Sequence, residues 1–348
     1  MLRDSELYRS DLHAACEGAA QSGALNGKRV LLTGATGLIG SFLAEALLYM
    51  NEAYGANIRV WVAGRSEAGV KRRFGAALDG KTLVYAPYDA TRHIDFDFDA
   101  DIVIHAACSA HPMAYATDPV GVMQANVFGT MQLIEYLRAR PGAKLIFLST
   151  GETYGENPDL PEGFSETDHG YIDPMNPRAC YPESKRAAET LIACGVKQYG
   201  IDARVARLCH VYGPTFTESN SRADAQFLRN ALRGEDIVMK STGAQVRSYC
   251  YVADAASAIL TLLEKGEPGQ AYNVANRNST ASIREYAETL AEAAGVLLRF
   301  ELPPEVERAG YTRVTRAVLN PAKLEALGWR PRFDLKTGLE HTLECARG

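Results

Sequence analysis

The distribution of apolar positions along the chain predicts strands that alternate with helices. Short, almost wholly apolar runs bounded by glycine or polar residues indicate buried strands, and longer segments with apolar residues every three or four positions indicate helices. The pattern gives strands at 28–33, 58–63, 82–85, 101–105, 144–149 and 203–208, and helices at about 38–50, 119–138 and 180–199. Buried strands that alternate with helices form a parallel, doubly wound α/β sheet.

The two ends of the chain depart from this pattern. Residues 1–26 indicate a helical N-terminal extension, with packing or oligomer contact as its simplest role. Beyond residue 208 the alternation becomes irregular, which favours a smaller, mixed α/β domain. We expect a large domain of residues 27–208 plus about 244–263, and a smaller C-terminal domain of residues 209–243 and 264–348 that supplies a substrate pocket.

Composition excludes several classes of protein. The chain has 348 residues, 47% of them apolar, which is enough for a substantial core. A net charge of −5 argues against a nucleic-acid partner. The apolar runs are far shorter than the roughly 20 residues of a membrane helix, and the N-terminus does not have the pattern of a secretion signal. Seven scattered cysteines without metal-ligand spacing indicate reduced thiols in a cytoplasmic protein, and we expect no metal.

A glycine-rich turn lies between the first predicted strand and the first predicted helix. Its glycines let the backbone turn tightly and approach a pyrophosphate, which the helix N-terminus stabilises through its free N–H groups. This turn predicts a dinucleotide site at the carboxyl edge of a Rossmann-type sheet. The residues expected to contact the cofactor there are Gly34, Thr36, Gly37, Leu38, Ile39 and Gly40.

A tyrosine and a lysine lie four positions apart on the helix predicted at 180–199. Tyr181 and Lys185 therefore share one face of that helix. The lysine ammonium and a nearby cationic nicotinamide both favour the phenolate, so they lower the tyrosine pKa. Tyr181 can then remove the proton of a substrate hydroxyl as a hydride passes to the nicotinamide.

These motifs together resemble the extended short-chain dehydrogenase/reductase family, in its nucleotide-sugar epimerase/dehydratase branch. The glycine turn has the spacing G-x-x-G-x-x-G, and further matches extend the resemblance over about residues 28–340; they are Asn126-Val-Phe-Gly-Thr130, Gly243-Ala-Gln-Val-Arg247 and Leu327-Gly-Trp-Arg-Pro331. The resemblance implies a Rossmann-type fold, a nicotinamide cofactor, a nucleotide-diphosphate sugar as substrate, and a homodimer joined through two helices per subunit.

The resemblance also assigns residues to the cofactor. Asp89 would hold the adenine, Ala106 and Ala107 would let the dinucleotide lie across the sheet, and Asn126 and Ser149 would complete the site together with Tyr181 and Lys185. The second strand ends in Arg65 rather than an acid, and an arginine can accept the 2′-phosphate of NADP. Similar enzymes that recycle their cofactor mostly hold NAD, so we expect NAD, with NADP as the alternative.

A second motif, Leu148-Ser-Thr-Gly-Glu-Thr-Tyr-Gly155, bears on the reaction. By resemblance, Thr150 assists Tyr181, and Glu152 stands where decarboxylases and dehydratases carry a glutamate. Gly151 replaces the aspartate of the 4,6-dehydratases, which counts against that reaction. The run Arg178-Ala-Cys-Tyr181 resembles the UDP-glucuronate decarboxylase branch, whereas the inner residues Pro182-Glu-Ser184 match general epimerases.

Three further residues are expected at the substrate. Arg247 would grip the diphosphate through charge-assisted hydrogen bonds, His210 replaces the family's substrate-facing asparagine, and His111 is a candidate for contact with the sugar. We expect oxidation of the sugar at C4 followed by decarboxylation or elimination. The alternatives are a 4-epimerase (or 5-epimerase) of the same fold, an NADP-dependent keto-sugar reductase, and a non-catalytic dinucleotide sensor.

Overall fold

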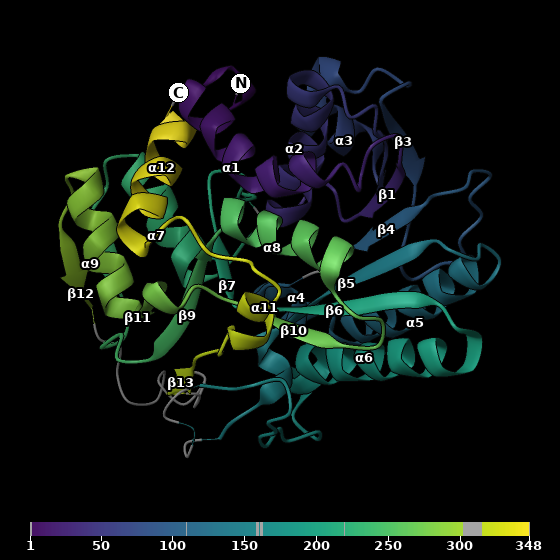
Figure 1. The fold of residues 1–348 in the computed structure, drawn as a ribbon. Coiled ribbons are helices and arrows are strands. Elements are labelled where there is room, and N and C mark those ends of the chain that lie inside the picture. The colour runs from purple at the N-terminus through teal and green to yellow at the C-terminus, as the bar shows by residue number, and fades with distance from the viewer. Residues whose placement is uncertain are drawn as a thin grey trace.

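A parallel sheet forms the centre of the molecule (Figure 1). The structure is a computed structural model and describes residues 2–108, 110–157, 160, 163–218, 220–301 and 315–347. Seven strands of these described residues form the large sheet, in the order β10-β6-β5-β4-β1-β2-β3. They are β1 (Arg29–Thr33), β2 (Arg59–Gly64), β3 (Leu83–Pro87), β4 (Ile102–His105), β5 (Lys144–Thr150), β6 (Asp202–Leu208) and β10 (Ala271–Val274). The strand order reverses direction between β1 and β4, which is where ligands of such sheets bind.

Side chains of the central strands alternate between two separate cores. Val30 and Leu32 of β1 belong to one apolar cluster, whereas Leu31 belongs to the other. A strand buried on both faces must be apolar at every position, because successive side chains point to opposite faces. This explains why the strands could be recognised as continuous apolar runs rather than as alternating ones.

Helices cover both faces of the large sheet (Figure 1). The cluster that contains Leu31 is closed by two long helices that pack against each other, α5 (Pro119–Arg138) and α6 (Cys180–Tyr199). The opposite cluster is closed by α2 (Leu38–Tyr54), α3 (Glu67–Phe74) and α8 (Val252–Lys265). No helix in the described residues is long and apolar enough to span a lipid bilayer.

The remaining strands form two small sheets beside the large one. In the described residues, β9 (Val246–Tyr251) pairs with β7 (His210–Tyr212), β11 (Thr280–Ser282) and β13 (Arg316–Ala317), and β8 (Ile237–Met239) pairs with β12 (Leu298–Phe300). Further α-helices of the described residues are α4 (Pro112–Thr117), α7 (Ala223–Leu232), α9 (Ile283–Ala294), α11 (Ala322–Ala326) and α12 (Leu335–Arg347).

The N-terminal helix α1 (Glu6–Ser22) is integral to the packing. Ser5 caps its first turn and Gly23, with φ +67°, ends it in the left-handed conformation. Tyr8 and Leu12 are buried on its inner face, which packs on α2 and α8. Figure 1 shows α1 next to α12, so the two ends of the chain lie together.

The structure confirms the doubly wound sheet and the main elements expected from the sequence. The helices expected at 119–138 and 180–199 have those bounds. Two strand pairings depart from the expected division of the chain: β10 lies in the large sheet although it was expected in the smaller domain, and β9 lies in a small sheet although it was expected with the larger one. The domain boundaries remain a prediction, and residues 302–314 lie outside the described residues.

Two titratable groups, half-buried His341 and buried Asp254, predict a fold that is more stable at acidic pH. Asp11 of α1 lies 2.8 Å from Nδ1 of His341, and this hydrogen bond raises the pKa of His341 above its ordinary value. Burial raises the pKa of Asp254 to about 7. Each group has a higher pKa in the folded than in the unfolded protein. Each therefore stabilises the fold fully below its unfolded-state pKa, and this contribution is lost as the pH rises through its folded-state pKa.

We therefore expect the melting temperature to fall between about pH 5 and pH 8, and the Asp254→Asn variant to show a shallower fall below about pH 7, because an amide carries no titrating proton. Thermal denaturation of both proteins over this range measures the effect. Equal slopes for the two proteins would contradict the assignment to Asp254.

Candidate active site

The glycine turn is fixed against the end of the neighbouring strand. A Cβ at Gly34, where φ is +68°, would lie 2.5 Å from the carbonyl oxygen of Ala106, so only glycine fits. The hydroxyl of Thr33 contacts Nδ1 of His105 at 2.8 Å and accepts hydrogen bonds from the backbone N–H groups of Ala106 and Ala107. These contacts tie the carboxyl ends of β1 and β4 together at the reversal of strand order.

The same turn fits a dinucleotide cofactor. Gly37 is the N-cap of α2 and no side chain caps the helix there. In the described residues, the nearest atom to a Cβ at Gly37 is the Gly34 carbonyl oxygen at 3.4 Å, which is ordinary contact. Packing within the protein therefore does not require a glycine at this position, whereas a pyrophosphate close to the free N–H groups of the helix does. Thr36 is exposed, and Leu38 and Ile39 are half-buried at the start of the same helix.

Asp89, the acid expected to hold the adenine, is fixed by hydrogen bonds within its own loop. Asp89 follows β3, and its carboxylate accepts hydrogen bonds from the backbone N–H and the hydroxyl of Thr91. These hydrogen bonds, together with the positive charges of Arg65 and Arg92, lower the pKa of Asp89. Arg65 is exposed at the end of β2, where the sequence placed it.

The side chains of two expected cofactor residues form hydrogen bonds with other side chains of the protein. The amide nitrogen of buried Asn126 donates to the hydroxyl of Ser184, which in turn donates to the Tyr181 carbonyl. The hydroxyl of Ser149 donates to Glu189, whose carboxylate also pairs with Arg207. Both contacts fix α6, the first to α5 and the second to the sheet, so their cofactor role remains a prediction.

The structure brings Thr150, Tyr181 and Lys185 together at the carboxyl end of β5. Burial raises the pKa of the Tyr181 phenol, and the nearby Thr150 hydroxyl lowers it by less. The Lys185 ammonium donates to the Leu148 carbonyl at 2.8 Å and lies 4.3 Å from the centre of the Phe147 ring. Burial lowers the pKa of Lys185. The protein alone therefore holds the phenol neutral, and the cationic nicotinamide is the additional charge that would favour the phenolate.

Glu152 lies beside this group and carries a specific partner. The short helix η3 (Gly151–Tyr154) follows β5, and Thr150 caps it by accepting from the Glu152 N–H. The Glu152 carboxylate forms an ion pair with Arg178 at 2.8 Å. Since both side chains are partly exposed, the pair is available to a ligand.

Sequence reasoning did not assign Tyr115, Arg178 or Arg222 to the site. The ring of Tyr115 stacks on Tyr181 with centroids 4.9 Å apart, and the Arg178 guanidinium lies 4.5 Å above the centre of the Tyr115 ring. Arg222 is half-buried, and its positive charge lowers the pKa of Tyr181 and of His210. Only Arg178 had a sequence signal, since it opens the run that ends in Tyr181.

The three residues expected at the substrate have different environments. Burial, with the charges of Arg222 and Arg247, lowers the pKa of His210 to about 3, so this imidazole is neutral. Arg247 is buried and donates to the Val246 carbonyl at 2.9 Å. His111 caps α4, where its Nδ1 accepts from the Ala114 N–H at 3.4 Å. The Nδ1 atom therefore carries no proton, and Nε2 of neutral His111 is a donor.

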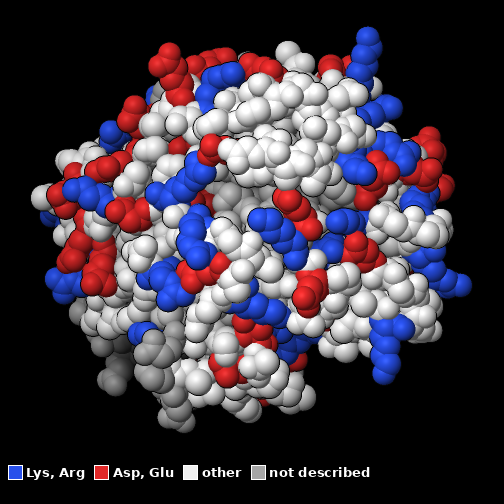
Figure 2. Space-filling view, viewed as in Figure 1, with Lys and Arg blue, Asp and Glu red and all other residues white. Residues whose placement is uncertain are grey.

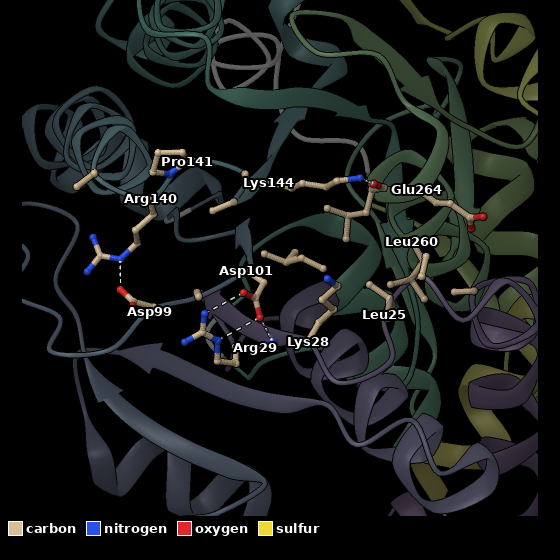
Figure 3. A pocket seen from close by; sticks show the side chains of 18 residues that line it. Leu25, Lys28, Arg29, Asp99, Asp101, Arg140, Pro141, Lys144, Leu260 and Glu264 are labelled. Carbon is tan, nitrogen blue, oxygen red and sulfur yellow. Dashed lines mark hydrogen bonds and ion pairs between the residues drawn. The ribbon is translucent and has the colours of Figure 1, made fainter.

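A separate cavity of about 530 Å³ lies at the amino ends of β1, β4 and β5, at the other end of these strands from the glycine turn (Figure 3). Figure 3 shows that its arginines are engaged by acids: Arg29 pairs with Asp101, and Arg140 with Asp99. Lys144 donates to the Leu263 carbonyl. The charges of this cavity therefore largely compensate one another. On the face drawn in Figure 2, acidic and basic side chains intermingle rather than forming one basic surface.

Comparison with known proteins identifies the family. The pattern of the NAD dependent epimerase/dehydratase family matches residues 30–275. The chain belongs to this family. It is therefore an NAD-dependent enzyme, which confirms NAD as the cofactor expected from the sequence.

Members of the NAD-dependent epimerase/dehydratase family with known activities are similar to the chain over most of its length. UDP-glucuronic acid decarboxylase 5 of Arabidopsis thaliana is 32% identical over 314 residues, 89% of this chain and 87% of that protein. UDP-glucuronic acid decarboxylase 1 of Danio rerio is 29% identical over 317 residues, which are 91% of this chain and 72% of that protein. The structure of UDP-glucose 4-epimerase from Thermus thermophilus in complex with NAD superposes with a TM-score of 0.77 at 30% identity, covering 92% of this chain and 99% of that one.

Substitutions at two glycines of the turn distinguish its role in packing from its role in cofactor binding. We expect Gly34→Ala to destabilise the fold by about 2 kcal/mol or more, because alanine is strained at φ +68° and its Cβ meets the Ala106 carbonyl. Gly37→Ala should change stability by less than about 0.5 kcal/mol and weaken NAD binding at least about tenfold. Thermal denaturation and titration with NAD measure the two effects. Unchanged NAD affinity in Gly37→Ala would contradict the assignment of this turn to the pyrophosphate.

Proposed function

We propose that this enzyme oxidises the sugar of a nucleotide-diphosphate sugar at C4 and then decarboxylates it or eliminates a substituent, with UDP-glucuronate as the leading substrate. The observation that carries the proposal is the position of Glu152 beside Thr150 and Tyr181, with the Lys185 ammonium bound to the Leu148 carbonyl of the strand that ends in Thr150. The similarity to UDP-glucuronic acid decarboxylases supports it.

The first chemical step belongs to Tyr181. NAD, when bound, supplies the hydride acceptor for the C4 carbon. The turn at Gly34–Gly40 would hold its pyrophosphate and Asp89 its adenine. Tyr181 must first be a phenolate, which the Thr150 hydroxyl, the buried ammonium of Lys185 and the nicotinamide charge favour. The phenolate then takes the proton of the C4 hydroxyl and becomes a neutral phenol.

The second step uses the ketone at C4. A carboxylate on the adjacent C5 carbon is then β to a carbonyl, so its C–C bond can break with release of carbon dioxide while the electron pair moves toward the C4 oxygen. The enolate left by loss of carbon dioxide takes up a proton at C5, and Glu152 is placed to transfer this proton, with Arg178 holding its carboxylate in position. The hydride then returns to C4, or a keto-sugar leaves. Arg247, and the neutral His210 next to it, are proposed to bind the diphosphate, with His111 at the sugar.

A 4-epimerase is the second candidate, in which the ketone is reduced again from the opposite face. Two observations favour it: the inner residues Pro182-Glu-Ser184 match general epimerases, and the Thermus UDP-glucose 4-epimerase superposes over 92% of this chain. Mass spectrometry distinguishes the two functions on a panel of UDP-, dTDP-, CDP- and GDP-sugars that includes UDP-glucuronate. Loss of carbon dioxide or water supports the first function, and a product of unchanged mass supports the epimerase.

Replacement of Glu152 tests its role in the second step. We expect Glu152→Gln to slow product formation by about 100-fold while oxidation at C4 continues, because the amide keeps a partner for Arg178 but can neither deliver nor accept a proton. Tyr181→Phe should abolish both steps. Product release and nicotinamide absorbance are followed in parallel, with exposed Glu156→Gln as the matched control. Full turnover by Glu152→Gln would remove Glu152 from the mechanism.

We also propose that the enzyme is a cytoplasmic homodimer. All seven cysteines are described and none forms a disulfide, which agrees with a reducing compartment. Along α5, the exposed side chains of Val120, Met123 and Met131 follow a helical spacing on the outer face. Such a stripe on a long helix is suited to pair with its own copy.

Charges on this stripe should separate the subunits. We expect the double variant Met123→Glu, Met131→Glu to be a folded monomer by light scattering, because two carboxylates per subunit would be buried in the interface. Leu297→Glu, at an exposed apolar residue remote from α5, is the control and should remain a dimer. A dimer that survives the double variant would place the interface elsewhere.

A further inference from the structure

The position of Tyr115 is the feature that the family assignment leaves unexplained. Tyr115 lies on the short helix α4, between the end of β4 and the start of α5. Its side chain is 3% exposed, and among the described residues its hydroxyl has no hydrogen-bond partner. A buried hydroxyl without a partner is costly to the fold, so such a group at an active site calls for a ligand that satisfies it.

The Tyr115 ring is held between two residues of the active site. One face stacks on Tyr181, with centroids 4.9 Å apart and 23° between the ring planes. The other side faces the Arg178 guanidinium at 4.5 Å, and Arg178 is itself paired with Glu152. Because both sides of the ring are engaged, Tyr115 is fixed in one orientation relative to Tyr181, the proposed base for the C4 hydroxyl.

The hydroxyl of Tyr115 has a chemistry different from that of Tyr181. Burial and the neighbouring Tyr181 and Glu152 raise the pKa of Tyr115 far above its ordinary value, with Arg222 as a smaller opposing influence. Tyr115 therefore keeps its proton when the Tyr181 phenol loses its own, and it can serve as a hydrogen-bond donor but not as a base.

We propose that Tyr115 is a further sugar-binding residue, whose hydroxyl donates a hydrogen bond to an oxygen of the substituent on C3 or on C5, the two carbons next to C4. This inference rests on the proposed function, since it places the sugar at Tyr181. Two oxygens share this chemistry: the hydroxyl on C3 and a substituent oxygen beyond C5, such as the carboxylate of a uronate. Arg178 is a positioning residue in this arrangement, because it fixes the Tyr115 ring and the Glu152 carboxylate together.

The test compares Tyr115→Phe with the wild-type enzyme, each saturated with NAD. Isothermal titration measures the affinity for UDP-glucuronate, UDP-xylose and UDP. We expect the variant to bind the nucleotide sugar roughly 10- to 100-fold more weakly and UDP equally well, because only a sugar contact is lost. A loss for UDP-glucuronate alone assigns the bond to the carboxylate, and a loss for both sugars assigns it to the C3 hydroxyl.

Thermal stability separates this role from a structural one. Phenylalanine keeps the ring and removes a buried hydroxyl without a partner in the described residues, so the free variant should melt at or above the wild-type temperature. Tyr88→Phe is the matched control: its hydroxyl is also buried without such a partner, and its loss should leave sugar binding unchanged.

Two outcomes overturn the inference in different ways. Equal sugar affinity in Tyr115→Phe and wild type, with turnover intact, would remove Tyr115 from the sugar site and leave the proposed function standing. A wild-type enzyme that binds these nucleotide sugars no better than UDP and turns none over would remove the proposed function, and this inference with it.

Discussion

The active site depends on a buried ammonium group. Lys185 is 2% exposed, and a charge in such a position must be satisfied by the protein. It donates to the Leu148 carbonyl at the end of β5, and lies over Phe147 of the same strand. This contact fixes the register of α6 against the sheet. Since Tyr181 lies one turn before Lys185, the same contact sets the position of the phenol relative to Thr150.

The surrounding contacts reinforce that register from three directions. Asn126 ties α6 to α5 through Ser184, and Glu189 ties α6 to the sheet through Ser149 and Arg207. On the substrate side, Tyr115 stacks on Tyr181 and Arg178 covers Tyr115. A helix held in this way keeps the catalytic phenol in place without relying on the ligand, so binding energy is available for the reaction rather than for ordering the site.

The sequence was sufficient to predict the features that follow a local pattern. Continuous apolar runs gave the strands of the large sheet, and the spacing between Tyr181 and Lys185 placed them on one helical face. Tyr115 was missed because its role depends on a ring contact between residues 66 positions apart, for which a single sequence has no periodic signal. The pairing of β10 with β6 was missed for a similar reason: partner choice among short strands is decided by tertiary packing.

The central claim is that Tyr181 deprotonates the C4 hydroxyl while the C4 hydrogen leaves as hydride. A substrate deuterated at C4 tests this most directly, with mass spectrometry of the enzyme-bound cofactor after rapid quenching. The account predicts that deuterium reaches the cofactor during turnover by the wild-type enzyme and does not do so in Tyr181→Phe. Turnover during which deuterium never leaves the sugar would contradict oxidation at C4 and the role assigned to Tyr181.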